Sequence, residues 1–279
     1  MEKRKTVWVA GASSGLGLAI ADAFAKAGWL VIAGARSYEN EANKTENPVR
    51  LKLDVSNGQS CARFAGVAMG ISPRVDALVC AAAVLVLGSC EKTGPEEYAR
   101  VWETNFLGAA HMVQQALPHM RAQGEGRVVL LSSINGLLGI PFQSAYTASK
   151  HALEGYAECL AMETKAYGVQ VCLVEPGDHR GGSQRTRLAA RREDAASPYA
   201  AAFGPACAAI RRDEAGGLRP ERLAAKVLKN AARRRMRFRL RVARPDQHLA
   251  VLLHDVLPAW LNFSILNGYY RKGKTNENT

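Results

Sequence analysis

A tyrosine and a lysine four residues apart are the first residues in this sequence whose types and spacing suit chemistry. Tyr146 and Lys150 lie in the segment Gln-Ser-Ala-Tyr-Thr-Ala-Ser-Lys-His, residues 143–151. In a helix, residues i and i+4 lie one turn apart on one face, so the phenol and the ammonium point the same way. A free tyrosine has a pKa of about 10, and a neighbouring cation lowers that pKa. The pair therefore predicts that Tyr146 exchanges a proton with a substrate.

A glycine-rich loop stands near the N-terminus, between a predicted strand and a predicted helix. Its sequence, residues 11–17, is Gly-Ala-Ser-Ser-Gly-Leu-Gly, which differs in spacing from the commoner Gly-x-Gly-x-x-Gly. The glycines permit a tight turn and close approach to a pyrophosphate, and the N–H groups that open the helix bind the anion. The loop therefore predicts a dinucleotide site. The expected contacts are Gly11, Ser13, Ser14, Gly15, Leu16 and Gly17.

The end of the second predicted strand indicates which dinucleotide is bound. An acidic residue there would hydrogen-bond the adenosine ribose hydroxyls, which is typical of NAD. This sequence has Ala35 followed by Arg36 instead. A guanidinium suits a 2′-phosphate, and no carboxylate is present to repel it. We therefore expect NADP(H) as the cofactor, with Ser13 adding a hydroxyl contact.

The elements that position these residues alternate along the chain. Strands are predicted from apolar runs, and helices from apolar residues at helical spacing. The predicted strands are residues 6–10, 29–35, 49–55, 75–82, 126–132 and 169–174, and the helices are 15–28, 57–70, 95–102, 105–122 and 143–167. This alternation predicts an α/β fold: a three-layer, doubly wound parallel sheet, Rossmann-like, covered by helices on both faces.

The C-terminal part has a different character. Residues 178–217 are rich in Arg, Ala, Gly and Ser with no clear strand, and an insertion after a strand's carboxyl end is typical of a substrate lid. Residues 220–235 predict a helix, and 236–242 a half-buried strand whose arginines form a charged, solvated outer face. In the tail, leucines and a tryptophan share one helical stripe, which Pro258 is expected to split. We expect one domain, 1–279, with a lid at 178–217 and a helical extension at 246–279.

The composition excludes several classes of protein. The six cysteines form no Cys-x-x-Cys pair, which indicates reduced thiols in a cytoplasm and no zinc or other metal site. The longest uncharged apolar run, residues 77–88, is about half of a membrane span, and we find no signal peptide. The net charge of +12 favours a solvated basic surface over a nucleic-acid groove. We therefore expect a soluble cytoplasmic protein without a nucleic-acid partner.

From about residue 6 to residue 177 the chain resembles the single-domain short-chain dehydrogenases/reductases. The likeness rests on the glycine loop, on Asp54-Val55 and on Asn105, Ser133, Tyr146 and Lys150 in the family's order and spacing, with Ser133 thirteen residues before Tyr146. The resemblance implies hydride transfer between the nicotinamide and a carbinol or carbonyl carbon. It also implies a homodimer or homotetramer.

The resemblance assigns a role to each catalytic residue. Tyr146 exchanges the substrate proton, and Ser133 hydrogen-bonds the substrate oxygen. Lys150 lowers the pKa of the tyrosine and binds the nicotinamide ribose, and Asn105 holds a water that links Lys150 to solvent. The further cofactor contacts that it implies are Asp54, Val55, Ala81, Ala82, Pro176 and Gly177.

Three positions depart from the family pattern. Ala10 replaces the threonine that usually precedes the first glycine. The usual Asn-Asn-Ala-Gly segment is Cys-Ala-Ala-Ala at residues 80–83, so side-chain amides that tie the central strands are lost. The threonine that normally contacts the carboxamide falls at Gly181. All three lie outside the Ser–Tyr–Lys–Asn set.

The substrate is indicated by the segment between Ser133 and Tyr146 and by the lid. An apolar wall suits a bulky lipophilic alcohol or ketone, such as a hydroxysteroid. The predicted wall is Leu137, Leu138, Ile140, Pro141 and Phe142, extended by Leu87 and Cys90. Arginines in the lid suit a carboxylate, a CoA phosphate or a carrier protein instead, which makes a 3-ketoacyl reductase the alternative. These arginines are Arg180, Arg185, Arg187, Arg191 and Arg192.

Two other classes are less favoured. A non-catalytic dinucleotide-binding regulator usually lacks the tyrosine or the lysine, and both are present here. The second class is a protein that contacts a membrane surface through the apolar stripe of its tail. Such a stripe more often packs in a core or a subunit interface.

Overall fold

The computed structural model describes residues 4–39, 43, 45–181 and 187–271. In this part of the chain, seven parallel strands form one sheet in the order β3-β2-β1-β4-β6-β7-β9. They are β1 (Thr6–Ala10), β2 (Leu30–Ala35), β3 (Val49–Lys52), β4 (Ala77–Cys80), β6 (Gly126–Leu131), β7 (Val169–Pro176) and β9 (Arg239–Val242). The strand order reverses at β1 and β4, and α/β sheets bind ligands at the carboxyl ends on either side of such a point. The predicted fold class is confirmed.

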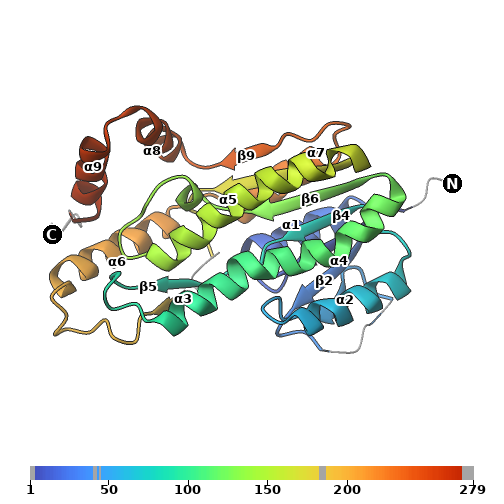
Figure 1. Ribbon diagram of the computed structural model, residues 1–279, viewed down its shortest axis with the longest axis horizontal. Helices are drawn as coiled ribbons and strands as arrows, with labels where there is room; N and C mark the ends of the chain where they lie inside the picture. Colours follow the sequence, from blue (N-terminus) through green and yellow to red (C-terminus); the bar gives the residue numbers. More distant parts are fainter. Residues whose placement is uncertain (1–3, 40–42, 44, 182–186, 272–279) are drawn as a thin grey trace.

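The strands are buried on both faces because they read as continuous apolar runs. In β1, Trp8 packs into the core on one side of the sheet, and Val7 and Val9 pack into the core on the other side. Helices α2 (Gly58–Ile71), α4 (Gly108–Gln123) and α5 (Ser144–Thr164) cover the first side. Helices α1 (Gly15–Lys26) and α7 (Pro220–Ala231) cover the second, so that the molecule has three layers (Figure 1).

The two helices predicted at 95–102 and 105–122 are joined without a break. Helix α3 (Pro95–Trp102) continues into a π-helical turn, η1 (Glu103–Leu107), and then into α4. A π turn adds one residue to a helical turn and often marks a functional site. The inserted turn contains Asn105, which is buried.

The prediction of a segment without strands after residue 177 was wrong. Strand β8 (Arg187–Ala189) pairs in parallel with β5 (Leu85–Leu87), a strand that follows β4. A second element, the alanine-rich helix α6 (Ala200–Ala215), follows it. A three-residue strand carries no period of its own, and its partner lies about a hundred residues away in sequence, so the pattern could not reveal it.

The tail forms two helices, α8 (Pro245–Val256) and α9 (Ala259–Arg271), divided at Pro258 as predicted. Figure 1 shows them at the end of the molecule where the chain leaves β9. The predicted apolar stripe faces two ways. Leu253 is half-buried and lines a cavity, whereas Trp260 is 72% exposed and Val256 is 66% exposed. In the described residues no helix has the length and apolar character to cross a membrane.

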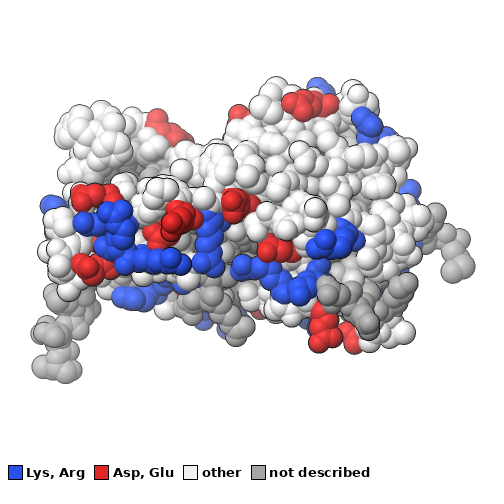
Figure 2. Space-filling view, turned by 60° about the horizontal axis from the view of Figure 1, so that its bottom comes forward, with Lys and Arg blue, Asp and Glu red and all other residues white. Residues whose placement is uncertain are grey.

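The arginines of β9 do not form a purely solvated face. Glu175 is fully buried. Its Oε1 accepts a hydrogen bond from Arg239 Nη1 and its Oε2 accepts one from Arg241 Nε, each at 2.8 Å. Arg239 also pairs with Glu154. On the molecular face in Figure 2, too, Lys and Arg side chains lie interspersed with Asp and Glu. Part of the basic excess of the sequence is thus held in ion pairs.

Candidate active site

The glycine loop is shaped by close packing against the segment after β4. Gly11 has a φ of +89°, and a Cβ there would lie 2.4 Å from the amide nitrogen of Ala82. A Cβ on Gly17 would lie 2.1 Å from the Gly11 carbonyl oxygen. The loop can therefore take this form only with glycine at both positions. Ala81, which replaces an asparagine of the family pattern, and Ala82 form the surface against which it packs.

A cavity of about 610 Å³ runs from this loop to Tyr146. Its volume is in the range of small-molecule and cofactor sites. Of the predicted cofactor contacts, Gly15 does not line the cavity; its φ of +57° instead provides a left-handed turn. The others all line it: Gly11, Ser13, Ser14, Leu16, Gly17, Arg36, Asp54, Val55, Ala81, Ala82, Tyr146, Lys150, Pro176 and Gly177.

The adenosine end predicted for the cofactor holds Arg36 at the tip of β2. Arg36 is exposed, lines the cavity and makes no ion pair within the described ranges. Asp54 stands nearby, with Oδ1 accepting the Ser56 hydroxyl at 2.7 Å and the Ser56 amide at 3.1 Å. These bonds hold the Asp54 carboxylate in a local turn. The guanidinium is left available to an anion.

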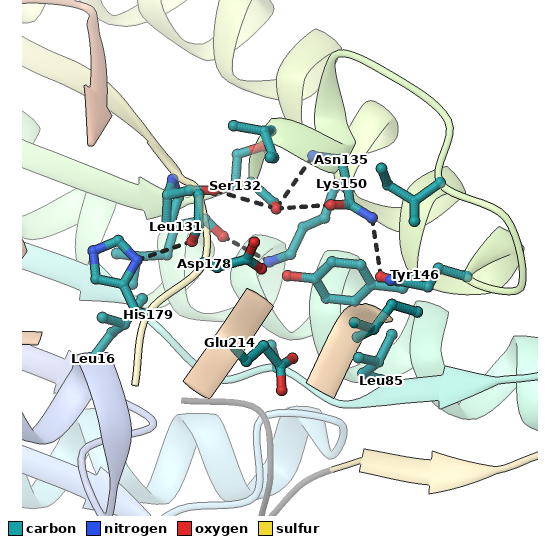
Figure 3. A pocket seen from close by; sticks show the side chains of 18 of the residues that line it. Leu16, Leu85, Leu131, Ser132, Asn135, Tyr146, Lys150, Asp178, His179 and Glu214 are labelled. Atoms are coloured by element: carbon teal, nitrogen blue, oxygen red, sulfur yellow. Dashed lines mark hydrogen bonds between the residues drawn. The ribbon is translucent and has the colours of Figure 1, made fainter. Parts of the chain in front are cut away.

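At the other end of the cavity, α5 carries Tyr146 and Lys150 on one face, as the spacing predicts (Figure 3). Lys150 is 2% exposed, and its Nζ donates to the carbonyl oxygen of Leu131 at 2.6 Å. The same nitrogen lies 5.5 Å from the centre of the Tyr146 ring. The lysine is thereby fixed between the end of β6 and the tyrosine.

The prediction that the pKa of Tyr146 is lowered is wrong for this arrangement. Burial raises the pKa of the Tyr146 phenol to about 12, with the Ser133 hydroxyl opposing that shift. Burial also lowers the pKa of Lys150 to about 8, against the opposing effect of Glu154. Desolvation is the largest cause of both shifts because both groups lie in the protein interior. Tyr146 is thus held as a neutral phenol, the form that donates a proton.

Ser133 follows β6 and is held by a residue that the sequence reading missed. Its Oγ accepts the Asn135 amide at 3.2 Å and lies 3.3 Å from Asn135 Oδ1. Asn135 Nδ2 donates in turn to Gln143 Oε1 at 3.0 Å, at the start of α5. Asn135 therefore connects Ser133 to the helix that carries Tyr146. The signal for it was its place two residues after Ser133, in the turn η2 (Ile134–Gly136).

Asn105 lies in the π turn behind Lys150's helix. Its Oδ1 accepts the Val84 amide at 2.8 Å, and its Nδ2 donates to the Val84 carbonyl at 3.0 Å and to Ser149 Oγ at 3.0 Å. Both N–H groups of the side chain are therefore used within the protein. The side chain ties the segment after β4 to α5 and so supports the site from behind.

The predicted apolar wall is confirmed only in part. Leu138 and Ile140 line the cavity, but Leu87, Cys90, Leu137, Pro141 and Phe142 do not. Phe142, for example, packs against Phe203 of α6, with ring centres 5.3 Å apart. The rest of the wall comes from the C-terminal helices, which the sequence could not place. These residues are Leu249, Ala250 and Leu253 of α8, and Ile265, Leu266, Tyr269 and Tyr270 of α9.

The lid arginines do not line the cavity in the described residues; Arg185 lies outside them. Arg187 pairs with Glu214, and Arg180 Nε donates to the Gly217 carbonyl at 3.1 Å. Acidic and amide side chains from the lid and from the start of α8 line it instead, and the sequence did not predict them. They are Asp178, Asp213, Glu214, Asp246 and Gln247, together with His179 and Arg244.

Comparison with known proteins agrees with this geometry. The family model described as short chain dehydrogenase matches residues 5–191. The chain is 33% identical to 3-ketodihydrosphingosine reductase of Bacteroides thetaiotaomicron over 236 residues, which cover 85% of this chain and 87% of that protein. It is 36% identical to human 17-beta-hydroxysteroid dehydrogenase type 1 over 187 residues, 62% of this chain and 56% of the relative.

A solved short-chain dehydrogenase from Streptomyces avermitilis has the same fold. It superposes with a TM-score of 0.82 at 30% sequence identity, over 97% of this chain and 98% of its own. The match thus extends through the C-terminal helices that complete the cavity. These comparisons agree with the cavity and with the presence of Asn105, Ser133, Tyr146 and Lys150. The chain therefore belongs to the short-chain dehydrogenase/reductase family of oxidoreductases.

Proposed function

We propose that the protein is an NADP(H)-dependent oxidoreductase that interconverts a secondary alcohol and a ketone on a bulky lipophilic molecule. The observation that supports this best is the single cavity. It connects the glycine loop and Arg36 to Tyr146, and then continues between apolar side chains of α8 and α9. One end suits a phosphorylated dinucleotide and the other an apolar substrate, with the proton-exchanging residue between them.

The residues present fit the dinucleotide. Gly11 and Gly17 let the loop pack tightly against the segment after β4 and against itself, and the N-terminus of α1 supplies N–H donors for the pyrophosphate. Arg36 would bind the 2′-phosphate, and Pro176 and Gly177 would pack at the nicotinamide. When bound, NADP(H) supplies or accepts the hydride.

The chain's own residues manage the oxygen and its proton. In the reduction, Tyr146 donates the phenolic proton to the substrate oxygen, and Ser133 hydrogen-bonds that oxygen. Lys150, fixed by the Leu131 carbonyl, places its positive charge beside the phenolate that remains. Asn135 keeps Ser133 in position. The oxidation runs through the same contacts in reverse.

The alternative of a 3-ketoacyl reductase has less support. An acyl carrier or CoA thioester needs cations at the cavity mouth, and the lid arginines that the structure describes do not line the cavity. Arg244 does line it, but it is paired with Asp246. The hydroxysteroid-like class, and lipophilic ketones generally, match the apolar wall better. The relatives named for a sphingoid ketone and for a hydroxysteroid are consistent with this class.

A spectrophotometric screen tests the proposal. NADPH or NADH is supplied with a panel of lipophilic ketones, and loss of reduced cofactor is followed by its near-ultraviolet absorbance. We expect ketone-dependent oxidation of NADPH in preference to NADH, and its loss in Tyr146→Phe. Unchanged turnover in that variant would contradict the proton role. A clear preference for NADH would contradict the role of Arg36.

A further inference from the structure

One amide side chain stands in the apolar part of the cavity wall. Asn262 of α9 lines the cavity and is only 4% exposed. Among the residues that the structure describes in α9, it is the one that is buried. Residues three, four and seven positions further along a helix lie on the same face, and Ile265, Leu266 and Tyr269 line the cavity as well. The helix thus places an amide at one end of an otherwise largely apolar stripe.

The Asn262 side chain has no hydrogen-bond partner in the part of the chain that the structure describes. Its backbone N–H donates to the Pro258 carbonyl at 3.1 Å, but its side-chain amide forms no bond there. Neither amide atom is sealed from solvent, so the small exposed part of the side chain faces the cavity that it lines. Buried polar side chains nearly always have a partner, and each exception calls for an explanation. A ligand in the cavity provides one.

The other residues of the wall indicate that this ligand group is neutral. Four carboxylates from the lid and the start of α8 line the cavity, and they repel an anion; these are Asp178, Asp213, Glu214 and Asp246. The guanidinium of Arg244 also lines it but is paired with Asp246. Leu249 and Leu253 of α8 add apolar surface, which disfavours any unpaired charge. A hydroxyl group fits, because it can donate to Asn262 Oδ1 or accept from Nδ2.

We propose that Asn262 hydrogen-bonds a hydroxyl group that the substrate carries away from its reacting carbonyl. This inference rests on the proposed function, because it takes Tyr146 as the residue that contacts the carbonyl oxygen. The apolar side chains of α8 and α9 then surround the part of the molecule between the two oxygens. Asn262 is in this view a specificity-determining residue that takes no part in the transfer of the proton or the hydride.

A homologous series of long-chain methyl ketones tests the proposal. Each chain length is prepared with a methyl, a hydroxymethyl or a carboxylate group at the far end, and kcat/KM is measured with NADPH. We expect the wild-type protein to prefer the hydroxymethyl ketone over the methyl ketone by roughly five- to tenfold, the effect of one net hydrogen bond, mainly through KM. Because the wall fixes the position of Asn262, the preference should be confined to a narrow range of chain lengths. The carboxylate ketone should be the poorest of the three.

Asn262→Leu has a similar shape but cannot form the hydrogen bond, so the preference for the hydroxymethyl ketone should disappear. Asn267→Leu is the matched control, because Asn267 lies on the same helix, is exposed and does not line the cavity. It should keep the wild-type preference. Thermal unfolding without substrate should give Asn262→Leu a Tm equal to or above that of wild type, since an amide without a protein partner has been removed. Fluorescence titration verifies that both variants bind NADPH.

Four outcomes would overturn the inference. The first is a wild-type protein that shows no hydroxyl preference at any chain length. The second is a preference that persists in Asn262→Leu, and the third is a preference for the carboxylate ketone. The fourth is a lower Tm for Asn262→Leu, which would mean that the amide supports the fold itself. Reduction of the ketones without a hydroxyl preference contradicts this inference alone, whereas no reduction of any ketone contradicts the proposed function as well.

Discussion

Lys150 Nζ donates to the carbonyl oxygen of Leu131 at 2.6 Å, and this bond ties α5 to the end of the strand that leads into Ser133. Two segments of the active site are thus held in register by one buried hydrogen bond. Because the bond fixes the ammonium 5.5 Å from the Tyr146 ring, its charge is placed to stabilise a phenolate formed during turnover.

Tyr146→Phe should lower kcat by about a thousandfold, the usual loss when a positioned proton donor is removed. NADPH binding should be retained, because the phenyl ring keeps the packing. Tyr156→Phe, on the same helix and also with a pKa raised by burial to about 12, is the control. Stopped-flow turnover and cofactor titration of both variants measure the two quantities. A similar loss of kcat in both would show that the effect is not specific to Tyr146.

Lys150 should make stability rise with pH in the alkaline range. Burial lowers its pKa in the folded protein to about 8 from 10.5, so between these values the unfolded chain binds more protons than the folded one. The free energy of unfolding then increases with pH by about 1.4 kcal/mol per unit from this group, about 3 kcal/mol in all. Urea unfolding of wild type and Lys150→Met at pH 7.5 and 9.5 measures it. The difference between the two proteins should shift in favour of wild type at the higher pH, and an equal pH dependence would contradict the assignment.

Arg36→Ala should weaken NADPH binding by roughly ten- to a hundredfold and leave NADH binding nearly unchanged, because only NADPH carries the 2′-phosphate. Arg50→Ala is a suitable control, since Arg50 is exposed, stacks over Tyr38 and pairs with Glu46. Fluorescence titration with both cofactors gives the ratio of dissociation constants. If Arg36→Ala weakens both cofactors equally, the residue does not discriminate between them.

The elements that depend on residues close together in sequence could be predicted, whereas the elements that depend on contacts between distant residues could not. The glycine loop, the sheet strands and the Tyr146–Lys150 pair were predictable because each depends on residues within one or two turns of chain. The second half of the cavity was not, because β8 pairs with β5 and α8 reaches back to Asp178. The lowered pKa predicted for Tyr146 failed for a related reason. Burial is a property of the whole fold, and here it is the largest cause of the raised pKa.

The arginine face of β9 was also misjudged from sequence, and the environment of Glu175, which pairs with two of these arginines, can be tested. It is fully buried between Arg239 and Arg241, so Glu175→Gln leaves two guanidinium groups facing an uncharged amide. We expect a loss of about 2 kcal/mol in the free energy of unfolding, below the range for a fully buried pair because both arginines are partly exposed. Glu158→Gln, whose exposed carboxylate also pairs with Arg239, should cost less than about 1 kcal/mol. Urea unfolding separates the two, and equal losses would contradict the role of burial.

Asp178→Asn should stabilise the fold at neutral pH, because burial disfavours the charged form of this carboxylate. Burial and Asp213 raise its pKa to about 6 from 3.8, with Arg244 and Gln247 opposing and Asp246 adding to the shift. The folded protein therefore holds the proton more tightly than the unfolded chain, and stability falls as pH rises from about 4 to 6. The asparagine keeps an acceptor for Gln247 but has no charge to desolvate. We expect a gain of about 1 kcal/mol at pH 7.5, about 2–4 °C in Tm, that shrinks towards zero at pH 5. Thermal unfolding of both proteins at the two pH values measures it, and a variant that is less stable at pH 7.5 would mean that the carboxylate supports the fold itself.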